Sequence, residues 1–571
     1  MNQHSKAQPM ASPTKIVSGK HGPLVGAIDQ GTSSTRFLTF ASKTSELIAY
    51  HQVEIEHILP KDGWVEEDPM EILNSVYECI ENTVEKLKDL EIDPRDIKAI
   101  GVSNQRETTI VWDKVTGKPL HNAIVWLDNR TTDTVEHLLD KIPGHDKEYL
   151  KVSEQQLVLA STSANTPLFG LLKLLLVPLH ANRACFCRLH LRILPSFTAN
   201  CRPAALLPMP PATKRTFLLE AADYLKCSCL CLVYSFFAVP MSVLPSIRSS
   251  SEIYGMLCDG PLAGVPISGC LGDQSAALVG QLCFNIGQAK CTYGTGCFLL
   301  YNTGLEIVQS NHGLLTTVAY KLGPNRPVQY ALEGSVAIAG AAVRWLRDNL
   351  SIINSSSEVE KLALTVNSSH GVCFVPAFAG LYAPYWQPDA RGIICGLTQF
   401  TTKAHIARAT LEAVCFQVRE ILDAMDSDTG VALKQLLVDG GMAVNELLMR
   451  LQADLLGICV VRPQMSETTA LGAAIAAGAA EGIDVWSLDS NKFPSVTTDV
   501  FEPSILPTER ESRYAKWKDA VRRSMHWQDT PDDANRKRQG DQWWILSSIP
   551  AGAFIMASFA TLLVAQSLSC R

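Results

Sequence analysis

The chain has 571 residues, more than one hydrophobic core usually supports, so the length predicts at least two domains. Hydrophobic residues make up 47% and charged residues 19%, as in ordinary folded globular proteins. The net charge of −7 provides no basic surface, so we expect no nucleic-acid partner. The 17 cysteines include no C-x-x-C pair with a matching second pair, which argues against a zinc site or a disulfide framework.

The chain begins with a polar stretch, residues 1–22, which we expect to be a disordered lead and not a secretory signal. The pattern then becomes α/β, in two halves. In the first half we predict strands at 25–28, 37–40, 97–102 and 109–112 and a helix at 69–90. In the second we predict strands at 265–268, 289–292, 297–301 and 436–439 and helices at 336–350, 405–425 and 445–456. Hairpins followed by helices in both halves predict two related lobes, residues 23–263 and 264–525.

Residues 159–239 fit neither pattern. The segment is rich in Leu, Pro, Ala and Cys, and its only acidic residues are Glu220 and Asp223. It has neither helical period nor strand alternation, although both flanks read as ordinary enzyme sequence.

The C-terminus carries a second unusual stretch. Residues 543–565 contain no charged side chain and are long enough to span a bilayer as a helix. The pair Trp543–Trp544 suits the membrane interface, and the basic residues at 536–538 favour a cytosolic N-terminal part. We predict a transmembrane tail after a linker at 526–542, in preference to a buried terminal helix. The expected location is the cytoplasmic face of the mitochondrial outer membrane, or the cytoplasm.

Three glycine-containing turns follow predicted strands and suit phosphate binding. In the first, residues 29–36, Gly31 permits close approach of an anion, Arg36 adds positive charge and Asp29 offers oxygen to Mg²⁺. The others lie at 292–296 and 439–445, and the latter runs into a helix whose first N–H groups suit a nucleotide. Each turn alone is equally compatible with an ordinary polar loop.

Two further positions suit the acceptor in a phosphoryl transfer, which needs a base for the hydroxyl proton. Asp273 follows an apolar strand and a glycine, so it could act as that base or simply cap a helix. Arg106 and Glu107 lie between predicted strands, where they could grip two hydroxyls of a polyol or form a surface ion pair.

Several long segments match one known family: residues 27–32, 103–108, 272–276, 292–298, 330–334, 374–386, 392–396 and 405–412. On these segments the chain resembles the glycerol kinases of the FGGY carbohydrate kinase family, in the actin–hexokinase superfamily. The resemblance covers residues 24–158 and 240–525. It implies an α/β fold of two actin-like, ribonuclease-H-like lobes, with ATP and Mg²⁺ in the cleft between them and glycerol as the phosphoryl acceptor.

The resemblance also implies roles by position. The nucleotide-binding residues would be Thr32, Ser33, Ser34, Arg36, Thr295, Gly340, Gly441 and Asn445. Arg106, Glu107, Asp273 and Gln274 would bind the glycerol hydroxyls, with Asp273 as catalytic general base, and Trp126 and Phe298 would contact the glycerol carbons. Asp29 and Asp273 would lie near Mg²⁺.

The chain departs from the family in the unusual segment. A Ser-Thr-Tyr-Phe motif, whose tyrosine contacts glycerol in the family, is absent, and residues 160–165 read Ala-Ser-Thr-Ser-Ala-Asn. The span from Glu107 to Asp273 nevertheless has nearly the family length. Correct length with different residues favours a shifted reading frame or misjoined exon over a divergent insertion.

Two rival functions stay open from the sequence. One is a kinase of another small polyol or sugar, and the other is a catalytically impaired, membrane-anchored protein that only binds. The sequence carries no signal for the oligomeric state, and a homo-oligomer is compatible with it.

Overall fold

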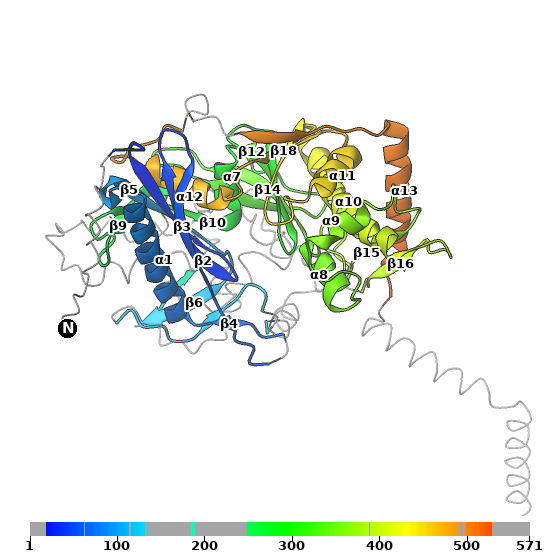
Figure 1. Ribbon diagram of the computed structural model, residues 1–571, viewed down its shortest axis with the longest axis horizontal. Coiled ribbons are helices and arrows are strands. Elements are labelled where there is room, and N and C mark those ends of the chain that lie inside the picture. The colour runs from blue at the N-terminus through cyan, green and yellow to red at the C-terminus, as the bar shows by residue number, and fades with distance from the viewer. Residues whose placement is uncertain are drawn as a thin grey trace, which may run out of the picture.

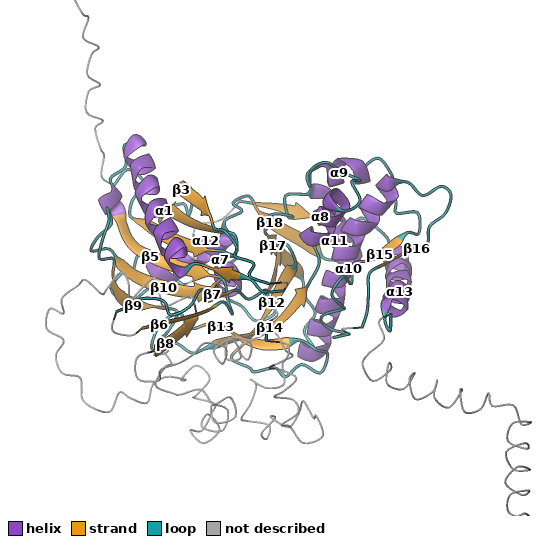
Figure 2. Cartoon of the chain, turned by 90° about the horizontal axis from the view of Figure 1, so that it is seen from below, coloured by secondary structure: helices purple, strands orange, loops and turns teal. Residues whose placement is uncertain are grey.

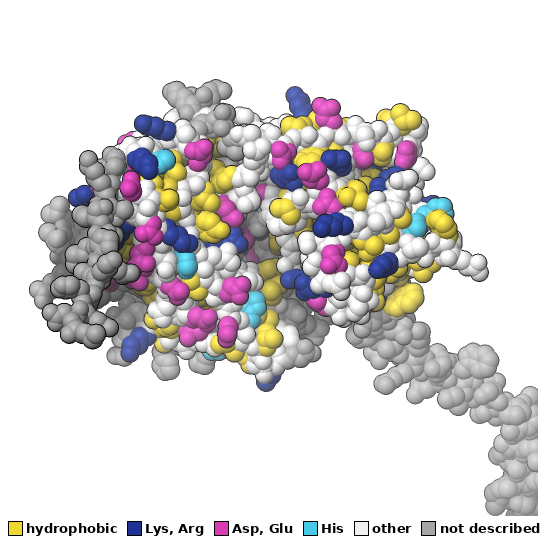
Figure 3. Space-filling view, viewed as in Figure 1, with side chains coloured by type: hydrophobic (Ala, Val, Ile, Leu, Met, Phe, Trp, Pro, Cys, Tyr) yellow, Lys and Arg dark blue, Asp and Glu magenta, His cyan; other side chains and the backbone are white. Residues whose placement is uncertain are grey.

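The structure is a computed structural model that describes residues 19–134, 184–188 and 248–527, apart from positions 62, 114–115, 129, 132–133, 388, 489–492 and 494–496. Two α/β lobes lie side by side, each built on a central sheet (Figures 1 and 2). On the face seen in Figure 3, acidic and basic side chains are interspersed over both lobes.

The first lobe contains a six-stranded sheet in the order β3-β2-β1-β5-β10-β9. Its strands are β1 (Leu24–Gln30), β2 (Ser34–Ala41), β3 (Leu47–Glu54), β5 (Ile97–Asn104), β9 (Ser251–Met256) and β10 (Pro266–Gly272). β1, β5 and β10 run parallel, so their C-terminal ends meet at one edge. That edge carries Asp29 and the residues directly after Asn104 and Gly272, which places three predicted site segments together.

The second lobe contains a seven-stranded sheet in the order β13-β14-β12-β11-β17-β18-β19. Its strands are β11 (Ala289–Tyr293), β12 (Cys297–Gly304), β13 (Leu315–Tyr320), β14 (Gln329–Val336), β17 (Gln435–Asp439), β18 (Cys459–Pro463) and β19 (Thr498–Phe501). β11 and β17 run parallel, with Thr292 beside Asp439. The turns that follow these two strands therefore emerge at the same edge.

Smaller elements complete the sheets. β4 (Glu66–Glu67), β6 (Thr109–Asp113), β7 (Ala123–Ile124) and β8 (Ala184–Arg188) form a four-stranded sheet, and β15 (Cys373–Val375) pairs with β16 (Ile393–Cys395). The helices are α1 (Pro69–Asp89), the 3₁₀ helix η1 (Pro94–Asp96), α7 (Asp273–Gly280), α8 (Gly340–Asp348), α9 (Glu358–Ala363), α10 (Lys403–Thr429), α11 (Glu446–Leu456), α12 (Thr468–Gly478) and α13 (Pro507–Ser524).

Local sequence explains where the long helices begin and end. Asp68 precedes α1 and accepts a hydrogen bond from the Met70 backbone N–H at 2.8 Å, while Pro69 occupies the first turn, where no N–H is needed. α10 begins with a capping box of Thr402 and His405 and ends at Gly430, whose φ of 67° suits glycine.

Helices α7 and α12 pack against each other through glycines. A Cβ at Gly472 of α12 would overlap the carbonyl oxygen of Ala276 in α7, and one at Gly280 would overlap that of Thr468. α12 also lies against β5, where a Cβ at Gly101 would meet the Ala473 backbone. This backbone-to-backbone approach fixes α7, and with it Asp273, relative to the first sheet.

Three apolar clusters make up most of the core in the described residues. One lies between the first sheet and α1, with Ile28, Phe37 and Val76 as members. Another joins the first sheet to α7 and α12 and reaches Leu300 of the second sheet. The third surrounds α10 in the second lobe. Because the second cluster includes residues of both sheets, the two lobes share part of their core.

The predicted strands and helices all correspond to observed elements, although several boundaries differ by up to four residues. The helix predicted at 336–350 begins only at Gly340, because Val336 still belongs to β14. The predicted lobe boundary at 263–264 falls between β9 and β10, adjacent strands of the first sheet.

Other predictions concern residues that the structure does not describe. The lead at residues 1–18, the linker beyond 527 and the tail at 543–565 lie outside the described residues, as does 159–239 apart from the backbone of β8. Within the described part of the chain, no helix combines the length and apolarity that crossing a membrane requires.

Candidate active site between the lobes

The first predicted phosphate loop is the tight turn between β1 and β2. The Gly31 N–H donates to the Ser34 carbonyl at 2.9 Å, and the Ser33 carbonyl accepts from the Ile55 N–H at 3.0 Å. The Thr32 hydroxyl accepts from the Trp126 indole N–H at 3.0 Å. Neighbouring residues thus hold the turn in place. The Thr32–Trp126 hydrogen bond also joins a predicted nucleotide-binding residue to a residue predicted to contact glycerol.

Asp29 and Arg36 face each other across the same hairpin. They are register partners in β1 and β2, and their side-chain atoms Oδ2 and Nη1 lie 4.0 Å apart. Burial raises the pKa of the Asp29 carboxyl to about 7, against the opposing effect of Arg36. Arg36 Nη1 also forms an ion pair of 2.8 Å with Glu467, which precedes α12.

Two further predicted nucleotide residues meet in the second lobe. The Gly340 N–H donates to the Gly294 carbonyl at 3.1 Å, and a Cβ at Gly340 would come within 2.6 Å of that oxygen. The Thr295 carbonyl accepts backbone hydrogen bonds from Ala339 and Ala341, both at 3.0 Å. The start of α8 therefore rests directly on the turn after β11.

The third loop follows β17. Gly440 has a φ of 92° and lies against the Tyr293 carbonyl, where a Cβ would overlap it. A Cβ at Gly441 would meet no atom within 4 Å, so the backbone there borders open space. Asn445 caps α11 by accepting from the Leu448 N–H at 2.8 Å. Gly441 and Asn445 thus lie beside the Tyr293–Thr295 turn.

Asp273 is the first residue of α7, and Gly272 occupies the capping position. Its Oδ1 accepts from the Gln274 backbone N–H at 2.7 Å and lies 3.3 Å from Arg106 Nε. Its Oδ2 has a longer contact, 3.3 Å, with Gln274 Nε2. Because one-third of the side chain is exposed, at 33%, Oδ2 can accept a further proton donor.

Arg106 connects Asp273 to the other lobe. Its Nη1 donates to Glu333 Oε2 at 2.7 Å and its Nη2 donates to Glu333 Oε1, a two-point pair with β14. Burial works against the charge on Arg106, but Glu333 and Asp273 outweigh it and raise its pKa above the usual range. The pair with Glu333 lies below the surface, since 18% of the Arg106 side chain and 4% of the Glu333 side chain are exposed.

Aromatic rings from both lobes form an apolar wall. Trp126, just after β7, meets Phe298 of β12 edge to face, with ring centroids 6.2 Å apart. Nearby, Glu107 adopts a φ of 66°, a left-handed backbone conformation that is uncommon for a residue other than glycine.

Two models of one family match the chain. The N-terminal domain of the FGGY family of carbohydrate kinases matches residues 24–164, and the C-terminal domain matches residues 289–481. A probable glycerol kinase of Dictyostelium discoideum is 45% identical over 544 residues, covering 89% of this chain and 99% of that protein. The chain belongs to the FGGY family of carbohydrate kinases.

Other members of the FGGY family support the assignment. A glycerol kinase of Pseudarthrobacter chlorophenolicus is 46% identical, with 88% of this chain and 98% of that protein covered. A crystal structure of Plasmodium falciparum glycerol kinase with ADP has a TM-score of 0.74 at 33% identity, covering 89% of this chain and 98% of that one. A gluconate kinase from Lactobacillus acidophilus, at 19% identity and a TM-score of 0.68, shares the fold.

FGGY kinases use ATP, and the carboxylates present suit Mg²⁺. Asp29 and Asp273 are close enough for the charge of one to raise the pKa of the other. Among the described residues no group of three His, Cys, Asp or Glu could hold a metal by itself. Two carboxylates fit Mg²⁺, which usually binds one or two protein carboxylates together with water and substrate phosphates.

The sequence analysis did not assign a role to three residues of the site: Glu333, Arg344 and Lys290. Arg344 lies one turn into α8 and donates from Nη2 to Thr295 Oγ1 at 3.2 Å, which brings a cation to the nucleotide loops. Lys290 is fully buried in β11 and donates to Gln274 and Thr292. A charged residue inside a central strand was the available signal for both Glu333 and Lys290.

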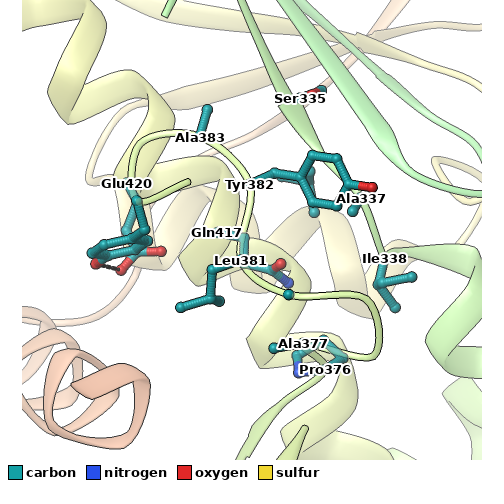
Figure 4. Close-up of a pocket in the computed structure, with 13 residues that line it drawn as sticks. Ser335, Ala337, Ile338, Pro376, Ala377, Leu381, Tyr382, Ala383, Gln417 and Glu420 are labelled. Atoms are coloured by element: carbon teal, nitrogen blue, oxygen red, sulfur yellow. Dashed lines mark hydrogen bonds between the residues drawn. The ribbon is translucent and has the colours of Figure 1, made fainter. Parts of the chain in front are cut away.

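A surface pocket of the second lobe lies between the end of β14 and α10, and none of its lining residues belongs to the predicted site. Figure 4 shows the Tyr382 ring directed toward Ala337, with Leu381 beside Gln417 of α10. The Tyr385 hydroxyl donates to the Glu420 carboxyl. Burial raises the pKa of Glu420 to about 7, so this carboxyl is partly protonated at neutral pH.

Proposed function

We propose that this chain is a glycerol kinase that transfers the γ-phosphoryl group of ATP to a terminal hydroxyl of glycerol. The observation that carries the proposal is the convergence of Arg106, Asp273 and Gln274 at one point between the lobes. The Trp126–Phe298 wall supports a small acceptor with an apolar carbon face. The similarity to glycerol kinases of several organisms, over nearly the whole length of those proteins, supports the same acceptor.

The chemistry follows from the exposed oxygen of Asp273. Oδ2 takes the proton of the attacking hydroxyl, whose oxygen bonds to the γ-phosphorus as the bond to the β–γ bridging oxygen breaks and ADP leaves. Arg106 and Glu107 orient the acceptor hydroxyls, and Arg106 itself is oriented by Glu333. Mg²⁺, held by Asp29 and Asp273, would neutralise charge on the β- and γ-phosphates.

The nucleotide would lie between the two sets of glycine turns. Thr32, Ser33, Ser34 and Arg36 approach its phosphates from the first lobe. Thr295, Gly340, Gly441 and Asn445 border it from the second lobe, where the N-terminal ends of α8 and α11 favour negative charge.

A substrate panel tests the acceptor. Purified full-length protein is incubated with MgATP and glycerol, a ketopentose, gluconate or water alone, and ADP release is measured. We expect glycerol to give the highest kcat/KM, well above hydrolysis by water. A ketopentose preferred over glycerol would indicate a different FGGY activity. Glycerol binding without ADP release would instead favour the catalytically impaired binding protein, which the unusual residues 159–239 make a specific alternative.

We also propose the C-terminal membrane anchor at residues 543–565, with the kinase on the cytosolic side of the mitochondrial outer membrane or of another membrane. It rests on the apolar run and the two tryptophans at its start. We expect the full chain to remain in the membrane pellet on alkaline extraction, and a chain ending at residue 542 to stay in the supernatant. Release of the full chain would contradict the anchor.

A further inference from the structure

We propose that Lys290 is a positioning residue that fixes the amide of Gln274 and thereby the orientation of the catalytic carboxylate of Asp273. The inference rests on the proposed function, because it concerns the same acceptor site. Lys290 was not among the residues that the sequence pointed to. It extends from β11 of the second lobe toward α7, whose first two residues are Asp273 and Gln274.

The first observation is burial. Lys290 is 0% exposed and is one of the largest fully buried side chains described. An ammonium group removed from water destabilises the fold unless it is compensated, so a merely structural position would favour an apolar residue. Burial holds the pKa of Lys290 below its usual range, while the nearby Asp439 acts to raise it.

The second observation is the direction of its hydrogen bonds. Nζ donates to Gln274 Oε1 and, at 2.8 Å, to Thr292 Oγ1. An ammonium group can only donate, so it accepts just one of the two orientations of the Gln274 amide. With Oε1 turned toward Lys290, the Nε2 group must face Asp273, and it lies 3.3 Å from Oδ2.

The chain of contacts therefore ends on the reacting group. Gln274 Nε2 donates to Oδ2, the oxygen of Asp273 that has capacity for the acceptor proton. If the amide were reversed, its carbonyl oxygen would face the carboxylate, repelling it and losing the donor. Lys290 prevents that reversal, and no flexible surface group is involved, because Gln274 is only 7% exposed.

The same residue lies beside the nucleotide loops. Thr292, its other acceptor, directly precedes Tyr293 and Gly294, and it is the register partner of Asp439, which precedes Gly440. Asp439 is buried and accepts from Gln281 at 3.2 Å and from Thr468. Lys290 thus lies between the acceptor residues and both glycine turns of the second lobe.

Two branches of this network give a matched pair of variants. Lys290→Met keeps an unbranched side chain one atom shorter but removes all donors, so the Gln274 amide is free to reverse. Thr292→Val removes the other acceptor with little change in shape and leaves the Lys290–Gln274 contact in place. Lys290→Gln retains a hydrogen-bond donor but can also accept. It should therefore keep the Gln274 amide in the observed orientation for only part of the time.

The experiment measures kcat, KM for glycerol, KM for ATP and the glycerol dissociation constant by calorimetry, together with the melting temperature. We expect Lys290→Met to lower kcat/KM for glycerol by roughly 10- to 100-fold, with KM for ATP changed by less than about 3-fold. Lys290→Gln should fall in between. Thr292→Val, at the start of the 292–296 turn, should raise KM for ATP more than it lowers kcat/KM for glycerol. In a Gln274→Met background, Lys290→Met should cause no further loss.

Equal losses for Lys290→Met and Thr292→Val, additive losses with Gln274→Met, or a change in melting temperature alone would overturn the proposal. If Lys290→Met does not fold, Lys290→Gln in the two backgrounds gives the same comparison. If the parent phosphorylates glycerol and Lys290→Met has the same kcat/KM for glycerol, only this inference is overturned. A parent that neither binds nor phosphorylates glycerol overturns the proposed function and this inference with it.

Discussion

Arg106 and Glu333 join the two lobes through a two-point ion pair, with Nη1 and Oε2 at 2.7 Å. Arg106 follows β5 of the first lobe, and Glu333 lies in β14 of the second. The same guanidinium reaches Asp273 with its remaining nitrogen, Nε, at 3.3 Å. One side chain thus holds the acceptor site and the contact between lobes together.

Glu333→Gln should therefore affect both binding and stability. We expect KM for glycerol to rise by roughly 10-fold and the free energy of unfolding to fall by about 3 kcal/mol, because a buried charge loses its main partner. Steady-state kinetics and urea unfolding measure the two effects. Glu306→Gln, at an exposed glutamate of the same lobe, is the control. Parent-like KM in Glu333→Gln would show that the pair does not orient Arg106.

Glu467 should weaken the phosphate site in the absence of nucleotide, because it pairs with Arg36 at 2.8 Å. We expect Glu467→Gln to lower KM for ATP by about 2- to 5-fold at low salt, and less at high salt, since both side chains are about one-third exposed. The exposed Glu481→Gln should leave KM unchanged. A higher KM for ATP in Glu467→Gln would instead give Glu467 a supporting role.

The contact between α7 and α12 makes Gly472 intolerant of alanine. Alanine normally stabilises a helix interior relative to glycine by about 1 kcal/mol. At Gly472 the added methyl would overlap the Ala276 carbonyl, so we expect destabilisation by about 1–3 kcal/mol and reduced kcat, since α7 carries Asp273. The sign of the change in the free energy of unfolding, measured by urea titration, distinguishes the two effects. Stabilisation by Gly472→Ala would contradict the close helix packing.

Glu420 should make stability depend on pH. Its carboxyl holds a proton up to about pH 7 in the folded protein, whereas an unfolded glutamate loses it near its ordinary value of 4.5. The folded state therefore binds more protons in this window, and stability falls as pH rises through it. We expect Glu420→Gln to gain about 2 kcal/mol relative to the parent between pH 5 and pH 8.

Thermal unfolding of both proteins across that pH range measures the effect. Glu446→Gln, at a surface pair with Arg450 in which 58% of the Glu446 side chain is exposed, is the control and should show no such gain. A constant difference between Glu420→Gln and the parent at all pH values would show that Glu420 is already ionised in the folded protein.

Much of the site could be predicted because its signals are local. Turns such as 29–36 and 292–296 combine glycine with hydroxyl residues directly after strands, and parallel strands bring such turns to one edge. Glu333 and Lys290 could not be assigned in this way, because their partners belong to the other lobe: Arg106 is 227 residues from Glu333, and Gln274 is 16 residues from Lys290. A sequence pattern does not indicate which strands of separate sheets face each other.

The boundary between the lobes shows the same limit. β10 looks like the start of a new α/β half, yet it is inserted beside β5 in the first sheet, and α12, from late in the chain, packs on the same sheet. The placement of α12 on this sheet depends on the close packing of Gly101 against the Ala473 backbone. This contact between distant residues is seen only in the folded structure.

The most direct test of the whole account is the rate of glycerol 3-phosphate formation by full-length protein with glycerol and MgATP, compared with Asp273→Asn. Asparagine keeps the shape of the side chain but cannot take the acceptor proton, so we predict turnover by the parent and a loss of roughly 10²- to 10⁴-fold in kcat for the variant. Asp259→Asn, at an exposed aspartate, should match the parent. No product from the parent above the level of Asp273→Asn, or equal rates for the two, would contradict the account.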